Sequence, residues 1–329
     1  MKVLIVGAAG MIGRKLADRL AKDGKLAGKR IDEAHFADVV PPRPTEAPFP
    51  ISVEACDMAA SYVPPKLAAR RADVIFLLAS IVSGEAEADF DKGYAINLGG
   101  TQAFFEALRR EHLASGGTYR PRLIFTSSIA VFGAPFPPLI GDEFLPAPLT
   151  SYGTQKAICE LLLGDYSRRG FFDGIGLRLP TICVRPGAPN KAASGFFSGI
   201  IREPLAGKEA ILPVSEDVRH WHASPRSAIG FLLHAAELDT SLLGARRTLN
   251  LPGVSATVGE QIEALRQIAG EKAAKLIRRE PDETIARIVA GWPRNFDPAR
   301  AKSLGFRADE DFAAIVRTYI ADDAPKAAG

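Results

Sequence analysis

The sequence predicts an α/β fold: a doubly wound parallel sheet with a smaller α/β domain interwoven toward the C-terminus. Three observations lead to this prediction. Short apolar runs typical of buried strands alternate with amphipathic stretches in the first half of the chain. A glycine-rich turn directly follows the first apolar run. Beyond Pro186, the elements become shorter and are separated by glycine and proline.

The first half contains six predicted strands. Each is a short apolar run bounded by glycine, proline or polar residues, as expected for strands covered on both faces. They cover residues 2–7, 34–40, 51–57, 72–80, 122–128 and 174–182. Apolar residues at helical spacing predict helices between them, at 11–24, 89–112 and 152–169.

The second half is less regular. Residues 227–238 predict a helix that packs back on the sheet, 246–253 predict a strand, and 257–270 and 282–290 predict amphipathic helices. We expect residues 1–182 to form a nucleotide-binding domain, with 223–250 packing onto it. Residues 183–222 and 251–329 are then expected to form a smaller substrate-binding domain.

The composition excludes several classes of protein. The 329 residues are long enough for two subdomains, and a net charge of only +3 with scattered basic residues argues against nucleic-acid binding. Three distant cysteines form neither a disulfide scaffold nor a metal site. The longest apolar run, residues 74–82, is too short to span a membrane, and no signal peptide is recognisable. We expect a cytoplasmic protein that binds no membrane.

The turn VGAAGMIG (6–13) predicts a dinucleotide site. It has the pattern G-x-x-G-x-x-G, follows the first strand and opens the first helix. Glycine permits a tight turn and a close approach to a diphosphate, and the helix N-terminus offers unpaired N–H groups. This position indicates a Rossmann-type fold, with Gly7, Gly10, Met11, Ile12 and Gly13 against the cofactor.

The second strand favours NAD over NADP. Asp38 lies near its end, where a carboxylate accepts hydrogen bonds from ribose hydroxyls and repels the extra phosphate of NADP. Asp32 and Glu33 are alternative carboxylates. Asp57, after the third strand, is a candidate for contact with the adenine, although it could equally face solvent.

Three polar residues form a candidate catalytic set. Ser128 ends the fifth strand, at the edge of the sheet where ligands bind in such folds. Tyr152 and Lys156 follow at i, i+4 spacing, which places both side chains on one helical face. The alternative reading is an exposed helix pair and a strand-end cap.

Together these pieces resemble the extended short-chain dehydrogenase/reductase superfamily, in its NAD-dependent epimerase/dehydratase group. The matching motifs are the glycine turn, LLAS (77–80), NLGGT (97–101), TSSIAVFG (126–133) and Y-x-x-x-K (152–156). The resemblance covers the whole chain. It implies that Ala79 and Ser80 lie beside the cofactor, that Asn97 supports the neighbouring backbone, and that the protein is a homodimer.

The resemblance also implies the catalytic roles. Tyr152 is the general base, Lys156 lowers the pKa of its phenol and holds the nicotinamide ribose, and Ser128 orients the substrate oxygen. A free tyrosine, with a pKa of about 10, needs a nearby cation to act as a base at neutral pH. The sequence argues against dehydration, because Ile129 and Ala130 follow Ser128 where dehydratases carry an acid pair.

Segments after the sixth strand bear on the choice of substrate. Thr181 stands where nucleotide-sugar epimerases typically carry an asparagine for the substrate diphosphate. RLPTICVRPG (178–187) and RHWHASPR (219–226) look like the D-erythronate dehydrogenase branch, which oxidises C2 of a four-carbon sugar acid. Arg219 is our first candidate for the substrate carboxylate and Arg185 the second, with Thr181 and Asn190 as hydroxyl partners. A nucleotide-sugar epimerase or reductase remains the alternative.

Overall fold

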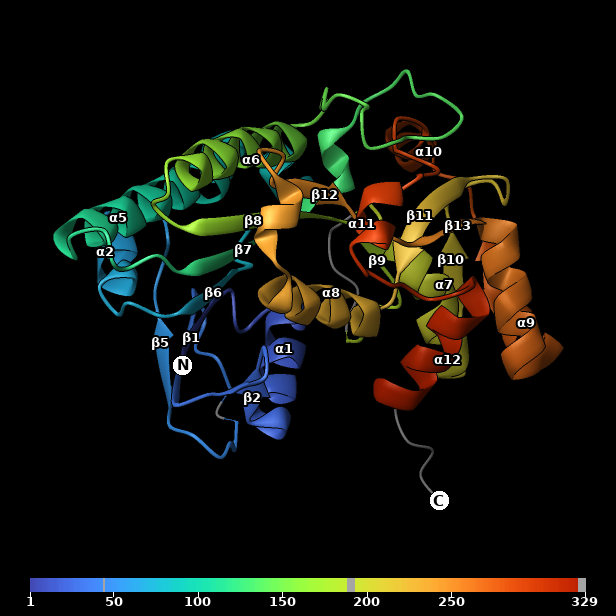
Figure 1. The fold of residues 1–329 in the computed structure, drawn as a ribbon. Helices are drawn as coiled ribbons and strands as arrows, with labels where there is room; N and C mark the ends of the chain where they lie inside the picture. Colours follow the sequence, from blue (N-terminus) through green and yellow to red (C-terminus); the bar gives the residue numbers. More distant parts are fainter. Residues whose placement is uncertain (44, 188–192, 325–329) are drawn as a thin grey trace. The chain divides into compact units, whose positions relative to one another are not determined.

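The computed structural model describes residues 1–43, 45–187 and 193–324 (Figure 1). They form two compact units, each assembled from separate stretches of the chain. The first unit comprises Met1–Val131, Thr150–Arg178 and Ile229–Asn250. The second comprises Phe132–Leu149, Leu179–Ala228 and Leu251–Gly329.

A seven-stranded sheet forms the centre of the first unit. The strand order is β12-β8-β7-β6-β1-β4-β5, and every registered pairing is parallel. The order reverses at β1, so the carboxyl ends of β1 and β6 mark the place where ligands collect in such sheets. The strands are β1 (Lys2–Val6), β4 (Glu33–Asp38), β5 (Ile51–Ala55), β6 (Val74–Leu77), β7 (Arg122–Ser128), β8 (Asp173–Leu179) and β12 (Thr248–Asn250).

Helices cover both faces of this sheet (Figure 1). On one face, a continuous core joins strand residues such as Leu4, Ile75 and Phe125 to α2 (Val63–Ala68), α5 (Thr101–Ala114) and α6 (Ser151–Arg168). The other face carries α1 (Met11–Asp23) and the part of α8 (Pro225–Glu237) that belongs to this unit. The doubly wound parallel sheet predicted from the sequence is therefore confirmed.

The long helix predicted over residues 89–112 has a wider turn inside it. After α3 (Ser83–Ala88), the chain forms α4 (Phe90–Gly93), a π-helix over Tyr94–Gly100, and then α5. π-Helical turns are rare and often occur at functional sites. Asn97 lies in this turn with only 1% of its surface exposed. A small β2–β3 hairpin (Lys25–Leu26, Lys29–Arg30) follows α1.

The second unit has its own core. β9 (Thr181–Ile182), β11 (Arg219–Ala223) and β13 (Val254–Thr257) form one sheet, and β10 (Ala210–Leu212) pairs with β14 (Ile277–Arg279). Apolar side chains of α7 (Gly195–Leu205), α9 (Val258–Ala274) and α12 (Phe312–Asp322) pack together around them. This unit also contains α10 (Glu283–Ala290) and α11 (Ala299–Ser303), whereas the 3₁₀ turns at Ile129–Val131 and Thr240–Leu243 belong to the first unit.

The units differ from the predicted domains at three places, because residues 132–149, 179–182 and 223–228 all belong to the second unit. The strand expected over 174–182 breaks at Pro180, which has no N–H to donate, so β8 ends at Leu179 and β9 pairs with β11 instead. Residues 132–149 belong to the second unit. There Ile140 bridges Phe296, and the Phe132 ring lies 5.8 Å from the Phe296 ring between centroids.

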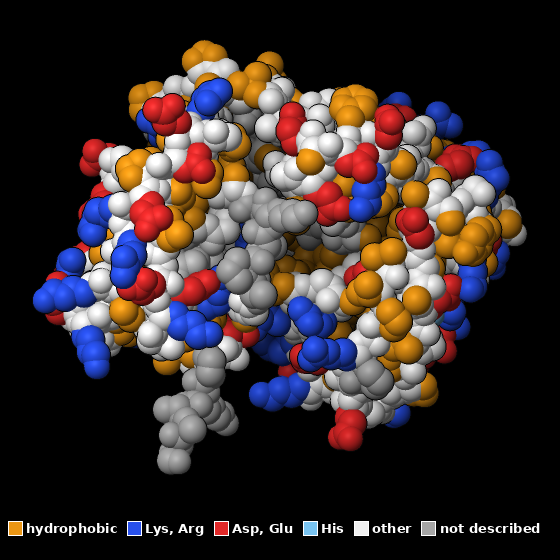
Figure 2. All heavy atoms as spheres, turned by 180° about the vertical axis from the view of Figure 1, so that it is seen from behind, with side chains coloured by type: hydrophobic (Ala, Val, Ile, Leu, Met, Phe, Trp, Pro, Cys, Tyr) orange, Lys and Arg blue, Asp and Glu red, His pale blue; other side chains and the backbone are white. Residues whose placement is uncertain are grey.

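Charged side chains of both signs are interspersed on the face drawn in Figure 2. This distribution fits the small net charge. No helix in the part of the chain that the structure describes is long and apolar enough to cross a membrane. The three cysteines, Cys56, Cys159 and Cys183, are free thiols.

We predict that Gly13→Ala destabilises the first unit. A Cβ at this position would lie 2.1 Å from the Gly7 carbonyl oxygen and 2.7 Å from the Ala8 Cα, and backbone cannot move aside as a flexible side chain can. Overpacking of this kind costs at least about 2 kcal/mol of unfolding free energy. Denaturant titration of the purified protein measures it.

The matched control is Gly230→Ala, also inside a helix. A Cβ there meets nothing within 4 Å, so alanine should leave stability unchanged or raise it by about 0.5–1 kcal/mol. Equal effects of the two substitutions would contradict the steric explanation.

Candidate functional site

The glycine turn lies at the point where the strand order reverses. Gly7 has a φ of +98°, and a Cβ there would lie 2.5 Å from the Ala79 nitrogen, so the turn after β1 lies against the end of β6. Gly13 allows α1 to approach β1. A Cβ on Gly10, in contrast, would approach only the Gly7 oxygen, at 3.4 Å. Gly10 is exposed, so its backbone remains open to a ligand.

The N-terminus of α1 fits an anionic group. Gly10 is its N-cap, so no side chain caps the helix, and no acidic residue lies in the first turn. The first N–H groups of a helix have no partners within the helix, and the dipole there favours negative charge. This arrangement, together with the open backbone at Gly10, fits a dinucleotide diphosphate.

Asp38 is part of the same turn. One carboxylate oxygen accepts a hydrogen bond of 2.8 Å from the Ala9 N–H, so the end of β4 is tied to the glycine turn. The two alternative carboxylates lie at the opposite end of β4. Asp32 pairs with the N-terminal amine at 2.5 Å, and Glu33 pairs with Lys2 at 2.9 Å. Their positions and partners leave Asp38 as the carboxylate beside the turn.

Asp57 is exposed and forms hydrogen bonds within the loop that follows β5. Its carboxylate accepts from the Ala59 N–H at 2.9 Å, and its carbonyl accepts from the Ala60 N–H at 3.0 Å. A contact with adenine stays a prediction.

Asn97 organises the segment after β6. Its Oδ1 accepts from the Ser80 hydroxyl and from the Ile81 N–H, both at 2.9 Å, and its Nδ2 donates to the Gln155 Oε1 at 2.8 Å. The amide of Asn97 thus links the segment after β6 to α6, and the side chains of Asn97 and Gln155 are almost fully enclosed. The predicted supporting role of Asn97 agrees with these bonds, and Gln155 is a partner that the sequence reading missed.

Lys156 is buried against β7. It is 2% exposed, its Nζ donates to the Thr126 carbonyl at 2.9 Å, and it lies 4.8 Å from the centroid of the Phe125 ring. Burial lowers the pKa of this ammonium to about 8, against the opposing influence of Cys159 and Glu160, which raise it. The residue is therefore no exposed member of a surface pair.

Tyr152 and Ser128 complete the predicted set. The Lys156 Nζ lies 5.7 Å from the centroid of the Tyr152 ring, as expected for a shared helical face. Ser128 lies two residues beyond Thr126, at the end of β7, and its Oγ accepts from the Ala130 N–H at 3.1 Å. Both side chains are partly exposed, so they remain accessible while Lys156 is enclosed.

A second buried charge lies one helical turn beyond Lys156. Glu160 receives two arms of Arg178, with the closest contact at 2.7 Å, and accepts from the Ser127 hydroxyl at 2.5 Å. Arg178 also donates to Asn250 at 3.1 Å. The sequence reading missed this group. The available signal was a glutamate at i+4 from Lys156, on the same helical face.

In the second unit, Thr181 is bound to a histidine of fixed tautomer. His220 Nδ1 lies 2.8 Å from the Pro293 carbonyl, which only accepts, so this nitrogen carries the proton. Burial lowers the pKa of His220 to about 4, so its Nε2 is an acceptor near neutral pH. The Thr181 hydroxyl, 2.7 Å away, donates to it. Because the hydroxyl proton of Thr181 is used in this bond, its oxygen can bind a further group only as a hydrogen-bond acceptor.

The two candidate arginines have different partners. Arg219 already contacts a carboxylate, with Glu260 at 3.2 Å, and donates to the Ser255 carbonyl. Arg185 donates to the Ile182 carbonyl at 3.0 Å and to the Ser194 hydroxyl at 3.3 Å. Asn190 lies outside the described residues.

Comparison with known proteins agrees with this geometry. The model of the NAD dependent epimerase/dehydratase family matches residues 3–225. D-Erythronate dehydrogenases from Haemophilus influenzae and Cupriavidus necator are 42% and 44% identical to this chain. Each alignment covers 98% of this chain, and they cover 100% and 98% of the respective relatives.

Solved structures share the complete fold. A nucleoside-diphosphate-sugar epimerase from Agrobacterium tumefaciens is 60% identical, with a TM-score of 0.95 over 98% of this chain and 94% of its own. A GalE-like L-threonine dehydrogenase from Cupriavidus necator is 25% identical, with a TM-score of 0.81 over 98% of this chain and 99% of its own. With the glycine turn, the Y-x-x-x-K helix and the reversed strand order in place, this chain belongs to the NAD dependent epimerase/dehydratase family.

Proposed function

We propose that this protein is a cytoplasmic, homodimeric NAD-dependent dehydrogenase that oxidises the C2 hydroxyl of D-erythronate to give 2-dehydro-D-erythronate. The observation that supports the chemistry most directly is Lys156, a buried ammonium next to the Tyr152 ring at the end of β7. Two D-erythronate dehydrogenases that match this chain over nearly their whole length support the substrate.

The residues divide the work of alcohol oxidation. NAD, when bound, accepts the hydride from the alcohol carbon. Tyr152, as a phenolate, takes the proton of the alcohol, and the Lys156 ammonium favours that phenolate electrostatically. Ser128 donates a hydrogen bond to the reacting oxygen. Asp38 holds the adenosine ribose and the glycine turn holds the diphosphate.

The proposed contacts with the hydroxyls and the carboxylate of the substrate are Thr181, Arg219, Arg185 and Asn190. Because the Thr181 hydroxyl donates to His220, its oxygen suits a substrate hydroxyl and would repel a carboxylate. Arg219 stays the first candidate for the carboxylate and Arg185 the second. The contact of Arg219 with Glu260 joins two exposed side chains, so it holds the guanidinium only weakly. Asn190 stays a candidate partner for a further hydroxyl.

The alternative is a nucleotide-sugar epimerase. The similar structure from Agrobacterium tumefaciens is described as an epimerase of this kind. Both activities need the Tyr152–Lys156 pair, so the catalytic set does not distinguish them. Thr181 favours the dehydrogenase, since it replaces the asparagine with which epimerases of the family typically hold the substrate diphosphate.

The first test follows NADH absorbance with NAD and a panel of four- to six-carbon aldonates and nucleotide sugars. We expect turnover with D-erythronate and none with nucleotide sugars. Tyr152→Phe should lower kcat by at least about 100-fold, because the base is lost, while NAD binding measured by calorimetry changes little. Full activity of Tyr152→Phe would refute the mechanism, and epimerised nucleotide sugars would support the alternative.

The second test concerns the substrate contacts. Arg219→Gln should raise KM for D-erythronate about tenfold or more, because a charge-assisted pair with the carboxylate is lost. Arg185→Gln, the matched comparison, should raise it less than about threefold if Arg219 is the ligand. Thr181→Val should also raise KM, and the reverse order of the two arginine effects would make Arg185 the ligand.

The third test concerns the dimer. Leu161 on α6 is 76% exposed, as expected if a partner subunit covers this helix in the manner typical of the family. Light scattering of the purified protein should give twice the mass of one chain, and Leu161→Lys should shift it toward the monomer. A monomeric wild-type protein would exclude the homodimer.

A further inference from the structure

The unassigned polar cluster beneath the catalytic edge joins four elements of the first unit. Glu160 (α6), Arg178 (β8), Ser127 (β7) and Asn250 (β12) are connected by hydrogen bonds of 2.5–3.1 Å. The side chains of Glu160 and Arg178 are 6% and 11% exposed. Burying a carboxylate and a guanidinium is costly, and it is compensated here by the paired contacts of the two groups and the further bond to Ser127.

The position of this cluster connects it to the reaction. Along β7, three consecutive residues meet α6 or the ligand edge: the Thr126 carbonyl accepts from Lys156, the Ser127 hydroxyl donates to Glu160, and Ser128 is the proposed substrate contact. Lys156 and Glu160 lie on successive turns of α6, on the same face of the helix. α6, which carries Tyr152, is therefore attached to the strand end that carries Ser128 at two points.

We propose that Glu160, held by Arg178, is a positioning residue for alcohol oxidation: it fixes α6 against the reactive end of β7 and thereby sets the placement of Tyr152 relative to Ser128. This role rests on the proposed function. It lies outside the Ser128–Tyr152–Lys156 set, because Glu160 acts through Ser127 and through the helix. A small displacement of reacting groups can cost about 100-fold in rate, so a rigid attachment here matters for catalysis.

The charge of Glu160 gives a second consequence. Around Lys156 lie Tyr152, Cys159 and Glu160 of α6, the neutral Thr126 carbonyl and Phe125 ring of β7, and Arg178 behind Glu160. Burial raises the pKa of the Cys159 thiol to about 11, so this group stays neutral. Glu160 is then the anion that opposes the effect of burial on Lys156. Removing its charge lowers the pKa of Lys156 further, and the ammonium is lost at a lower pH.

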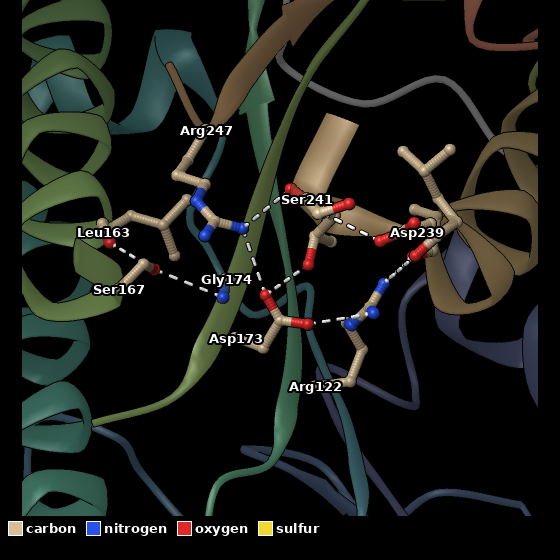
Figure 3. A network of polar contacts seen from close by, with 11 residues as sticks. Arg122, Leu163, Ser167, Asp173, Gly174, Asp239, Ser241 and Arg247 are labelled. Atoms are coloured by element: carbon tan, nitrogen blue, oxygen red, sulfur yellow. Dashed lines mark hydrogen bonds and ion pairs between the residues drawn. The ribbon is translucent and has the colours of Figure 1, made fainter. Parts of the chain in front are cut away.

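The opposite end of the same strands provides a matched control. Asp173, at the start of β8, pairs with Arg122 at 2.9 Å and Arg247 at 3.1 Å, and accepts from Thr240 at 2.6 Å (Figure 3). Asp173 and the side chain of Arg122 are each 19% exposed. This is also a partly enclosed carboxylate between arginines, but it lies at the amino ends of β7 and β8, away from the ligand edge. Its loss tests stability without moving the catalytic edge.

The experiment compares Glu160→Gln, Ser127→Ala and Asp173→Asn in the full-length protein. Glu160→Gln should lower kcat with D-erythronate between about tenfold and 100-fold, leave KM for NAD within about twofold, and move the alkaline limb of the kcat profile to lower pH. Ser127→Ala, which keeps both charges, should lower kcat without moving that limb. Asp173→Asn should lower the melting temperature while kcat stays within about twofold.

A readout without substrate separates this proposal from the proposed function. In protein labelled with ¹³C-lysine, the Cε shift of Lys156 reports its titration, and Glu160→Gln should lower the midpoint. Absence of turnover in the wild-type protein would refute the proposed substrate, and the variants would then be compared on the alcohol that the panel identifies. Equal kcat losses in Glu160→Gln and Asp173→Asn, or an unchanged midpoint and unchanged kcat in Glu160→Gln, would overturn the positioning role.

Discussion

The hydrogen bond from Lys156 to the Thr126 carbonyl is the interaction on which the rest of the site depends. An ammonium in an apolar interior is costly unless its donors are satisfied, and this bond supplies an acceptor from the strand itself. Because the donor is on α6 and the acceptor is on β7, the bond also determines how deeply the helix is seated on the sheet. Phe105 of α5, Phe125 of β7 and Cys159 of α6 belong to one hydrophobic core, which holds the helix in the same position.

The site combines fixed and open parts. Asn97 and Gln155 are almost fully enclosed and hydrogen-bonded to each other, whereas Tyr152, Ser128 and Gly10 have exposed surface. Pre-organised groups keep their geometry without cost at the moment of reaction, while accessible groups meet the ligands. The first unit thus presents a few reactive atoms on a support that is held by packing and by buried hydrogen bonds.

Much of the first unit could be predicted from sequence. The strands near residues 2–6, 33–38 and 122–128, the glycine turn and the Tyr152 helix have strong local signals, namely apolar period, glycine spacing and i, i+4 pairing. The contacts of Glu160 could not be predicted, because its partners lie 18 and 33 positions away and meet it only in the folded sheet. Local patterns also failed for 132–149, whose place is decided by long-range contacts with Phe296. The chain leaves the central sheet at Pro180 and joins a second sheet. This change depends on the pairing of β9 with β11, which are far apart in the sequence.

The wider turn over Tyr94–Gly100 has a consequence for how this family can vary in length. In an ordinary α-helix each residue advances the side chains by about 100°, so one residue removed from this turn would rotate Asn97 away from Ser80 and Ile81, or force α5 to turn on its axis. The first change leaves the buried amide of Asn97 without its hydrogen-bond partners. The second removes Phe104 and Phe105 of α5 from the core. The number of residues in this segment is therefore fixed. We expect insertions and deletions among relatives to fall in the surface loops, where the number of residues can vary.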